Sequence, residues 1–252
     1  MENTLVLNGG EKIDAAISKH KPKRKIVRIL AYGSVGLGLL LLLSHFVWVA
    51  SGSNQWVLDR DADGIKLWTM KSPGSGLIQV KAEVTMTTKL AGMVKLLEEL
   101  DESADAFTRD AKVIREIEST PGHRAMYSRF ILDFPVPGVA PRDYILFSER
   151  FQDPGTKKLE INLMAAPDMM PRDPCCVRVT HLHNNWKLTP LKNGDLNVVF
   201  TQDTDDGGIP YVFQNILLKE GTIMILDHMR GLMKQDKYQN AQVASIQELD
   251  AN

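Results

Sequence analysis

The chain has 252 residues, enough for one or two domains, and its hydrophobic and charged contents of 44% and 24% are ordinary for a folded protein. The formal net charge of −1 conceals an uneven distribution. Residues 1–28 carry seven Lys or Arg side chains against three acidic ones, a net charge of +4, so the remainder carries −5. A mildly acidic main part argues against nucleic-acid binding, which normally uses a basic surface.

An apolar segment extends from Ile29 to Ala50 without any Lys, Arg, Asp or Glu. About 22 helical residues span roughly 33 Å, enough for a hydrocarbon core of about 30 Å. Trp48 lies near one end, where interfacial aromatic residues are common, and the basic cluster flanks only the other end. The sequence therefore predicts a basic cytoplasmic tail at 1–28, a single transmembrane helix at 29–50 and an exported main domain, periplasmic if the source is Gram-negative.

Two alternatives to a transmembrane helix are a cleaved signal peptide and a buried core helix. Ala50 and Gly52 are small residues of the kind that precede a cleavage site. The apolar run, however, exceeds the usual signal core of about 7–15 residues, and charge-free runs of this length are rare inside soluble proteins. If the segment were cleaved, the main domain would become a soluble protein.

The rest of the chain divides into a short polar linker at 51–55, a single domain at 56–235 and a polar C-terminal tail at 236–252. Apolar and polar residues alternate from Ile78 to Met86, the pattern of a half-buried strand, and Leu90 begins a helical pattern that reaches Leu100. Further strands are expected at 64–70, 113–119, 124–134, 143–152, 158–165, 176–188 and 195–203.

A long helix is expected at 209–235, with Pro210 in its first turn and Gly221 at a bend. Its predicted apolar face consists of Phe213, Ile216, Leu217, Met224, Ile225, Met229, Leu232 and Met233. The order of strands, one helix, many strands and one long helix predicts an α+β domain, in which a curved antiparallel sheet wraps around the C-terminal helix.

Short motifs in this order resemble the START (StAR-related lipid-transfer) family over nearly all of residues 56–235, in a membrane-anchored, bacterial-type form. They are Trp56 with Asp63-Gly64-Ile65-Lys66-Leu67, Pro141-Arg142-Asp143-Tyr144, Val177-Arg178-Val179, Trp186 with Leu188-Thr189-Pro190, and Asp206-Gly207-Gly208-Ile209-Pro210 with Asn215. The resemblance implies a helix-grip fold that encloses one lipid, such as a sterol, phospholipid or ceramide, without a metal, a cofactor or catalytic chemistry.

The resemblance also suggests which residues meet the lipid. Arg129 falls near a charged cavity position of the family, and Ser148 or Arg150 falls near its partner on the next strand, although the usual Glu–Arg pair is absent. An inward Arg129 would need an acidic partner such as Asp133, Glu149 or Glu160, because an unpaired buried charge costs several kcal/mol. Phe213, Leu217 and Met224 are the lipid-contact candidates on the last helix, and the motif residues expected to be structural are Arg142, Asp143, Arg178, Trp186, Gly208 and Pro210.

Metal and disulfide chemistry find little support in the sequence. His181 and His183 share a strand face, but no third ligand lies nearby, so no metal site is expected. Cys175 and Cys176 would point to opposite faces of a strand, which argues against a bridge between them.

The sequence thus predicts a lipid-binding protein tethered to a membrane, for lipid transfer or for sensing. A cavity enzyme of the related cyclase or hydrolase type is a rival, with Arg129, Glu149 or His181 as acid–base groups, but no nucleophile or carboxylate pair stands out. A lipid-regulated scaffold or sensor is the other rival. No catalytic residue and no protein partner is predicted.

Overall fold

The computed structural model describes residues 24–98, 107–134 and 138–249, so most of the predicted basic tail and the last three residues of the predicted C-terminal tail lie outside it. The chain divides into two compact units between Val47 and Trp48. The second unit, from Trp48 onward, is called the main domain below.

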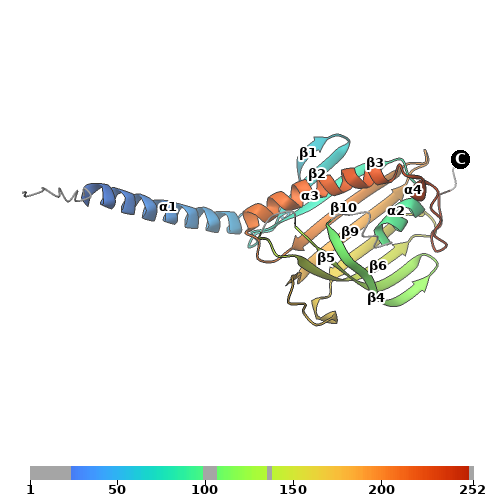
Figure 1. The fold of residues 1–252 in the computed structure, drawn as a ribbon. Helices are drawn as coiled ribbons and strands as arrows, with labels where there is room; N and C mark the ends of the chain where they lie inside the picture. The colour runs from blue at the N-terminus through green and yellow to red at the C-terminus, as the bar shows by residue number, and fades with distance from the viewer. Residues whose placement is uncertain (1–23, 99–106, 135–137, 250–252) are drawn as a thin grey trace, which may run out of the picture. The chain divides into compact units, whose positions relative to one another are not determined.

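The first unit consists of helix α1, Arg24–Ala50, up to Val47 (Figure 1). Within it, Ile26–Ala50 is long and apolar enough to cross a membrane. Its two polar serines are satisfied inside the helix, since Ser34 Oγ donates to the carbonyl of Ala31 and Ser44 Oγ to that of Leu41. Such internal hydrogen bonds are what a helix in hydrocarbon requires.

The main domain is built on a sheet that contains ten strands in the described residues. Their order across the sheet is β1-β2-β3-β10-β9-β7-β6-β5-β4, all antiparallel, and β8 pairs in parallel with β6. The bounds are β1 Val57–Ala62, β2 Ile65–Lys71, β3 Ile78–Met86, β4 Thr108–Thr120, β5 His123–Leu132, β6 Arg142–Gln152, β7 Leu159–Ala165, β8 Val177–Arg178, β9 His181–Pro190 and β10 Leu196–Asp205.

Strand alternation defines the two faces of the sheet. In β3, Ile78, Val80 and Ala82 are buried on the face that helix α3 covers, called the inner face here, while the intervening residues are half-buried on the outer face. The sequence missed β1, and its single expected strand at 176–188 is divided between β8 and β9.

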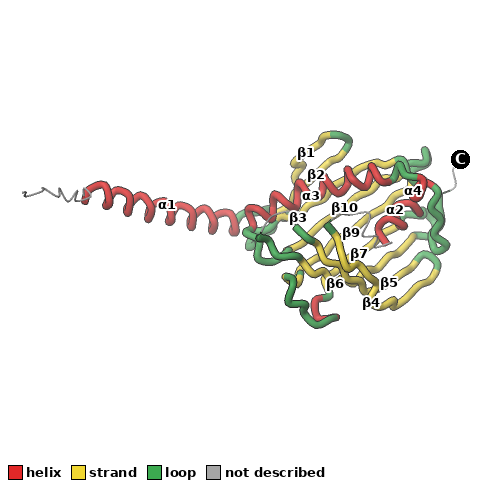
Figure 2. The backbone as a smooth tube through the Cα atoms, viewed as in Figure 1, coloured by secondary structure: helices red, strands yellow, loops and turns green. Residues whose placement is uncertain are grey.

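Helix α3, Tyr211–Leu232, runs across the inner face over β3 and β2 (Figure 2). It is shorter than the predicted 209–235, and Pro210 immediately precedes it. Of the predicted apolar face, Met229 and Met233 are buried, but Phe213 and Met224 are exposed to 62% and 61%. Besides Met229, the helix buries Gln214, Asn215, Leu218, Thr222 and Leu226.

The segment from Asp236 to Glu248 packs onto helix α2, Leu90–Glu98, although the sequence predicted a loose tail there. Both carboxylate oxygens of Glu248 accept hydrogen bonds from the first backbone N–H groups of α2, at 3.1 and 2.7 Å. Tyr238, in the short helix α4 (Asp236–Gln239), is 2% exposed within the main core. The compact region therefore extends beyond residue 235.

Candidate lipid-binding site

A row of side chains that is polar except for Leu163 crosses the inner face in the middle of the sheet. Ser148 of β6 pairs with Leu163 of β7, Leu163 with Asn184 of β9, and Asn184 with Gln202 of β10. Gln202 Oε1 accepts a hydrogen bond from Thr222 of α3, 3.0 Å away. The row divides the inner face into two apolar regions of different character.

On one side of the row the inner face is fully packed. Ile161, Trp186 and Phe200 lie one rung away and are 3–5% exposed. The rings of Trp186 and Phe200 stack with their centroids 3.9 Å apart. Ile161, Trp186 and Phe200 are therefore part of the main hydrophobic core, where Trp186 has a packing role.

On the other side the apolar residues are less completely covered. Tyr144, Leu146, Val179 and Leu182 form a second buried cluster, and Phe130, Leu132, Leu163 and Ala165 pack against it while remaining partly exposed. Partly exposed apolar side chains on an inner face are the kind of surface that a hydrocarbon ligand would cover.

The family-like motifs join β6 to the start of α3. Tyr144 donates to one carboxylate oxygen of Asp206 at 2.5 Å, and Gln214 Nε2 donates to the other at 2.8 Å. Arg142 donates to the carbonyls of Asp206 and Gly207 at 2.8 and 2.7 Å. Burial first, and then the charge of Asp206, raises the pKa of Tyr144 well above its ordinary value, so the phenol stays a proton donor.

The structure places Arg129 on the outer face of the sheet, not on the inner face where a lipid contact was expected. Its neighbour Phe130 lies on the inner face with Tyr144, so Arg129 lies on the outer face beside Ile145. There its Nε donates to Asp143 at 2.8 Å, and this hydrogen bond raises the pKa of Arg129. Neither Glu149 nor Glu160 is its partner.

Asp143 is shared between two arginines. Arg178 approaches its other oxygen at 2.8 Å, and the side chains of Asp143 and Arg178 are 1% and 2% exposed. Arg178 also donates to the carbonyls of Pro167, Met170 and Pro171 in the segment that follows β7. The motif residues Asp143 and Arg178 thus fasten this segment over the outer face.

Ser148 and Arg150 are two residues apart in β6, so both side chains lie on the inner face. Arg150 is 1% exposed, pairs with Glu98 at 2.6 Å and donates to Ser245 at 2.7 Å. Its Nε has no hydrogen-bond partner among the residues that the structure describes. Arg150 therefore links β6 to α2 and the chain end, while Ser148 belongs to the polar row. The sequence did not indicate Glu98 as the partner, because 52 residues separate the pair.

The predicted helix candidates Phe213, Leu217 and Met224 lie on the exposed side of α3, at 62%, 39% and 61% exposure. They face away from the buried stripe of the helix and do not line the space between α3 and the sheet. The structural candidates Gly208 and Pro210 lie in the turn between β10 and α3.

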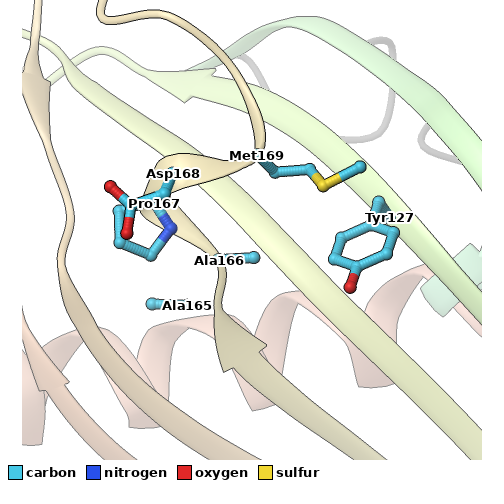
Figure 3. A pocket seen from close by; sticks show the side chains of 6 residues that line it. All are labelled: Tyr127, Ala165, Ala166, Pro167, Asp168 and Met169. Atoms are coloured by element: carbon cyan, nitrogen blue, oxygen red, sulfur yellow. The ribbon is translucent and has the colours of Figure 1, made fainter.

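No residue of α3 lines either of two open hollows in the main domain. One, of about 410 Å³, is lined by Tyr127 and by Ala165–Met169 around the short 3-10 turn Pro167–Met169 (Figure 3). The other, of about 220 Å³, includes His181, whose Nε2 lies 2.9 Å from Asp203. No group of three metal-ligating side chains occurs in the described ranges.

The two cysteines form a disulfide, contrary to the prediction from the sequence. That prediction placed Cys175 and Cys176 on a strand, where neighbouring side chains diverge. They lie instead in the turn that precedes β8, next to Asp173, whose carboxylate accepts from the backbone N–H of Cys175.

Comparison with known structures identifies the fold. No family model matches the chain. The STAR-related lipid transfer protein of Xanthomonas axonopodis (fragment 25–204) superposes with a TM-score of 0.63 and 23% identity, over 71% of this chain and 99% of that one. Human StAR-related lipid transfer protein 5 gives 0.63 and 16% identity, over 82% and 98%. The main domain has a START-like fold.

The START-like fold, with its antiparallel sheet and long C-terminal helix, confirms the predicted helix-grip architecture. Among curated sequences, an uncharacterized protein of Pseudomonas aeruginosa is 24% identical over 208 residues, covering 78% of this chain and 96% of that protein.

Proposed function

We propose that this protein binds one lipid on the inner face of its START-like domain, beside α3, for transfer or for sensing, while α1 anchors it in a membrane. The observation that carries the proposal is the half-covered apolar region beyond the polar row, within a fold shared with proteins described as lipid transfer proteins.

The inner face supplies both parts of an amphipathic ligand's environment. Phe130, Leu163 and Ala165 offer apolar contact, and removing a hydrocarbon chain from water is favourable by about 0.8 kcal/mol per methylene. Ser128 and Ser148 are 4% and 7% exposed and bring hydroxyl groups to the inner face. Hydroxyls of this kind suit a polar group of the ligand, because buried polar groups favour a hydrogen-bond partner.

The anchor would keep this domain close to its source of lipid. α1 is long and apolar enough to span a bilayer, and the basic residues of the sequence before it favour a cytoplasmic N-terminus. The main domain would then lie on the exported side, which is the periplasm in a Gram-negative cell. A tether raises the local concentration of a binding site at its membrane.

We propose a non-catalytic role. Each acid–base group considered from the sequence has a side-chain partner: Arg129 pairs with Asp143, Glu149 lies 3.1 Å from His123, and His181 lies 2.9 Å from Asp203. Groups held in this way serve the structure of the sheet and its covering segment.

Native mass spectrometry of the full-length protein, with lipid extraction of the same preparation, tests the proposal. We expect one copurifying lipid per chain. Leu163→Trp, on the partly covered inner face, should lower lipid occupancy at least five-fold, because the larger ring fills the space of the ligand. Met164→Trp is the matched control, since the adjacent side chain is 40% exposed on the outer face.

Equal occupancy in both variants would overturn the proposed location of the lipid. A protein that stays empty with every lipid class, yet converts an added substrate, would favour the cavity enzyme. Transfer between vesicles that carry the protein and acceptor vesicles then separates a carrier from a sensor.

A further inference from the structure

The last three residues of α1, Trp48–Ala50, belong to the main domain and are fixed there by side-chain contacts. Trp48 Nε1 donates to the carbonyl of Gly76 at 2.9 Å, and the indole stacks on Tyr211 with 6.3 Å between ring centroids and 7° between planes. The ammonium of Lys71 lies 5.0 Å from the indole centre. Since Tyr211 is the first residue of α3, the end of the apolar segment lies beside the start of that helix.

The backbone reinforces this attachment. Gly74 N–H donates to the carbonyl of Val49 at 2.8 Å, and Ser53 N–H donates to that of Lys71 at 3.1 Å. Gly52 has φ +128°, and a Cβ there would lie 2.5 Å from the Lys71 oxygen, so only glycine fits without displacement. The predicted linker is therefore held against the end of β2.

The first two turns of α3 present an apolar surface just beyond Tyr211. Val212, Phe213 and Ile216 are 54%, 62% and 52% exposed. Residues 209–218 contain no charged side chain, and charge returns with Lys219 and Glu220. Exposed apolar side chains gathered in one place are characteristic of surfaces that bind a partner or a membrane.

We propose that Val212, Phe213 and Ile216, called the α3 patch here, lie in the headgroup region of the bilayer that holds α1. The patch would dock the START-like domain on the membrane surface in one orientation. This inference rests on the membrane anchor of the proposed function, but not on the presence of a lipid on the inner face.

The contacts of Trp48 favour the bilayer over another protein as the occupant. Trp and Tyr are enriched where a protein crosses the membrane surface, and here Trp48 closes the apolar segment while Tyr211 opens the helix that carries the patch. Lys71 supplies a cation at the same level, with its ammonium 2.6 Å from the carbonyl of Ser51.

Quenching by spin-labelled lipids tests the docking in the full-length protein, reconstituted in nanodiscs of phosphatidylcholine and phosphatidylglycerol. A fluorescent maleimide is attached to Phe213→Cys, Phe151→Cys or Leu40→Cys. Phe151 is the matched control because it is 55% exposed and lies at the C-terminal end of β6, whereas the other end, at Arg142, contacts the turn before α3. The probe at position 40 reports whether α1 lies in the bilayer. The unsubstituted chain is treated with the same maleimide to measure any background labelling of Cys175 and Cys176.

We expect shallow doxyl lipids to quench the probe at 213 at least three-fold more than the probe at 151, with the probe at 40 quenched by deep doxyl lipids. Quenching at 40 together with equal, weak quenching at 213 and 151 would refute the docking alone. No quenching at 40 would refute the anchor and the docking together. A probe at 213 that is shielded from lipid and responds only to a second copy of the chain would refute the docking in favour of a dimer.

Lipid occupancy measured by mass on the same preparations keeps the two proposals separate. A docked domain without a copurifying lipid would support the α3 patch and contradict lipid binding on the inner face. A lipid-loaded domain with a water-exposed position 213 would do the reverse.

Discussion

Replacing Asp143 by Asn should destabilise the main domain strongly, because this carboxylate is the shared counterion of two arginines. Its oxygens lie 2.8 Å from Arg129 Nε and 2.8 Å from an Arg178 terminal nitrogen, and the side chains of Asp143 and Arg178 are almost fully buried. Breaking a buried ion pair by removing one partner costs about 3–5 kcal/mol, since the other charge stays buried and uncompensated.

We expect the lower part of that range, about 3 kcal/mol, because Arg129 keeps a second partner in Asp173 and Arg178 keeps its backbone carbonyls. At about 2–4 °C per kcal/mol for a domain of this size, the midpoint of thermal unfolding should fall by roughly 6–12 °C.

Urea and thermal unfolding of the full-length protein in detergent, followed by circular dichroism, measure this change. Glu220→Gln is the matched control, because it breaks the Arg60–Glu220 pair, whose side chains are 39% and 53% exposed. That exposed pair should contribute less than about 1 kcal/mol. If Asp143→Asn destabilises the protein no more than Glu220→Gln does, the Arg129–Asp143–Arg178 cluster does not hold the segment after β7 over the outer face.

Two further predictions concern glycines in α2 and α3 and a contact between the neighbouring strands β5 and β6. Gly92→Ala should destabilise the protein by about 1–3 kcal/mol, because a Cβ there would lie 2.6 Å from the Tyr238 carbonyl. A Cβ at Gly221 meets nothing within 4 Å, so Gly221→Ala should stabilise α3 by up to about 1 kcal/mol. Urea midpoints measure both changes, and equal effects would contradict the packing. The hydrogen bond to Glu149 raises the pKa of His123, so His123→Asn should lower stability below about pH 6.5, and the difference should fade as pH rises through the raised pKa; a pH-independent difference between urea midpoints would contradict the pairing.

The order of elements could be predicted because each depends on a local pattern. The charge-free run before Ala50 and the strict alternation from Ile78 to Met86 both appear in the structure as predicted, as a long apolar helix and as β3. Motifs spread along the chain pointed to the START-like fold, and the structural comparison bears that out.

The faces of the later strands could not be predicted in the same way. Residues Arg142–Leu146 of β6 are buried without alternation, because the segment fastened by Arg178 covers the outer face while the second apolar cluster covers the inner one. When both faces of a strand are covered, the two-residue period no longer distinguishes them. Arg129, on the neighbouring strand β5, was placed near the cavity by resemblance to the family, and only the register of β5 against β6 shows that it lies on the outer face.

The buried side of α3 likewise depended on distant partners. Gln214 and Asn215 are buried because the fold supplies hydrogen-bond partners: Gln214 Nε2 donates to Asp206, and Asn215 Oδ1 accepts from the backbone N–H of Ile78. The more apolar Phe213 and Ile216 point outward. Hydrophobicity along the helix cannot anticipate such pairs, since a buried polar group is tolerated only where the fold provides its partner. The sequence alone determined that an apolar helix precedes a START-like domain. Only the tertiary structure decided which side chains face the inner surface and which stay exposed on α3, because these depend on contacts between residues far apart in the chain.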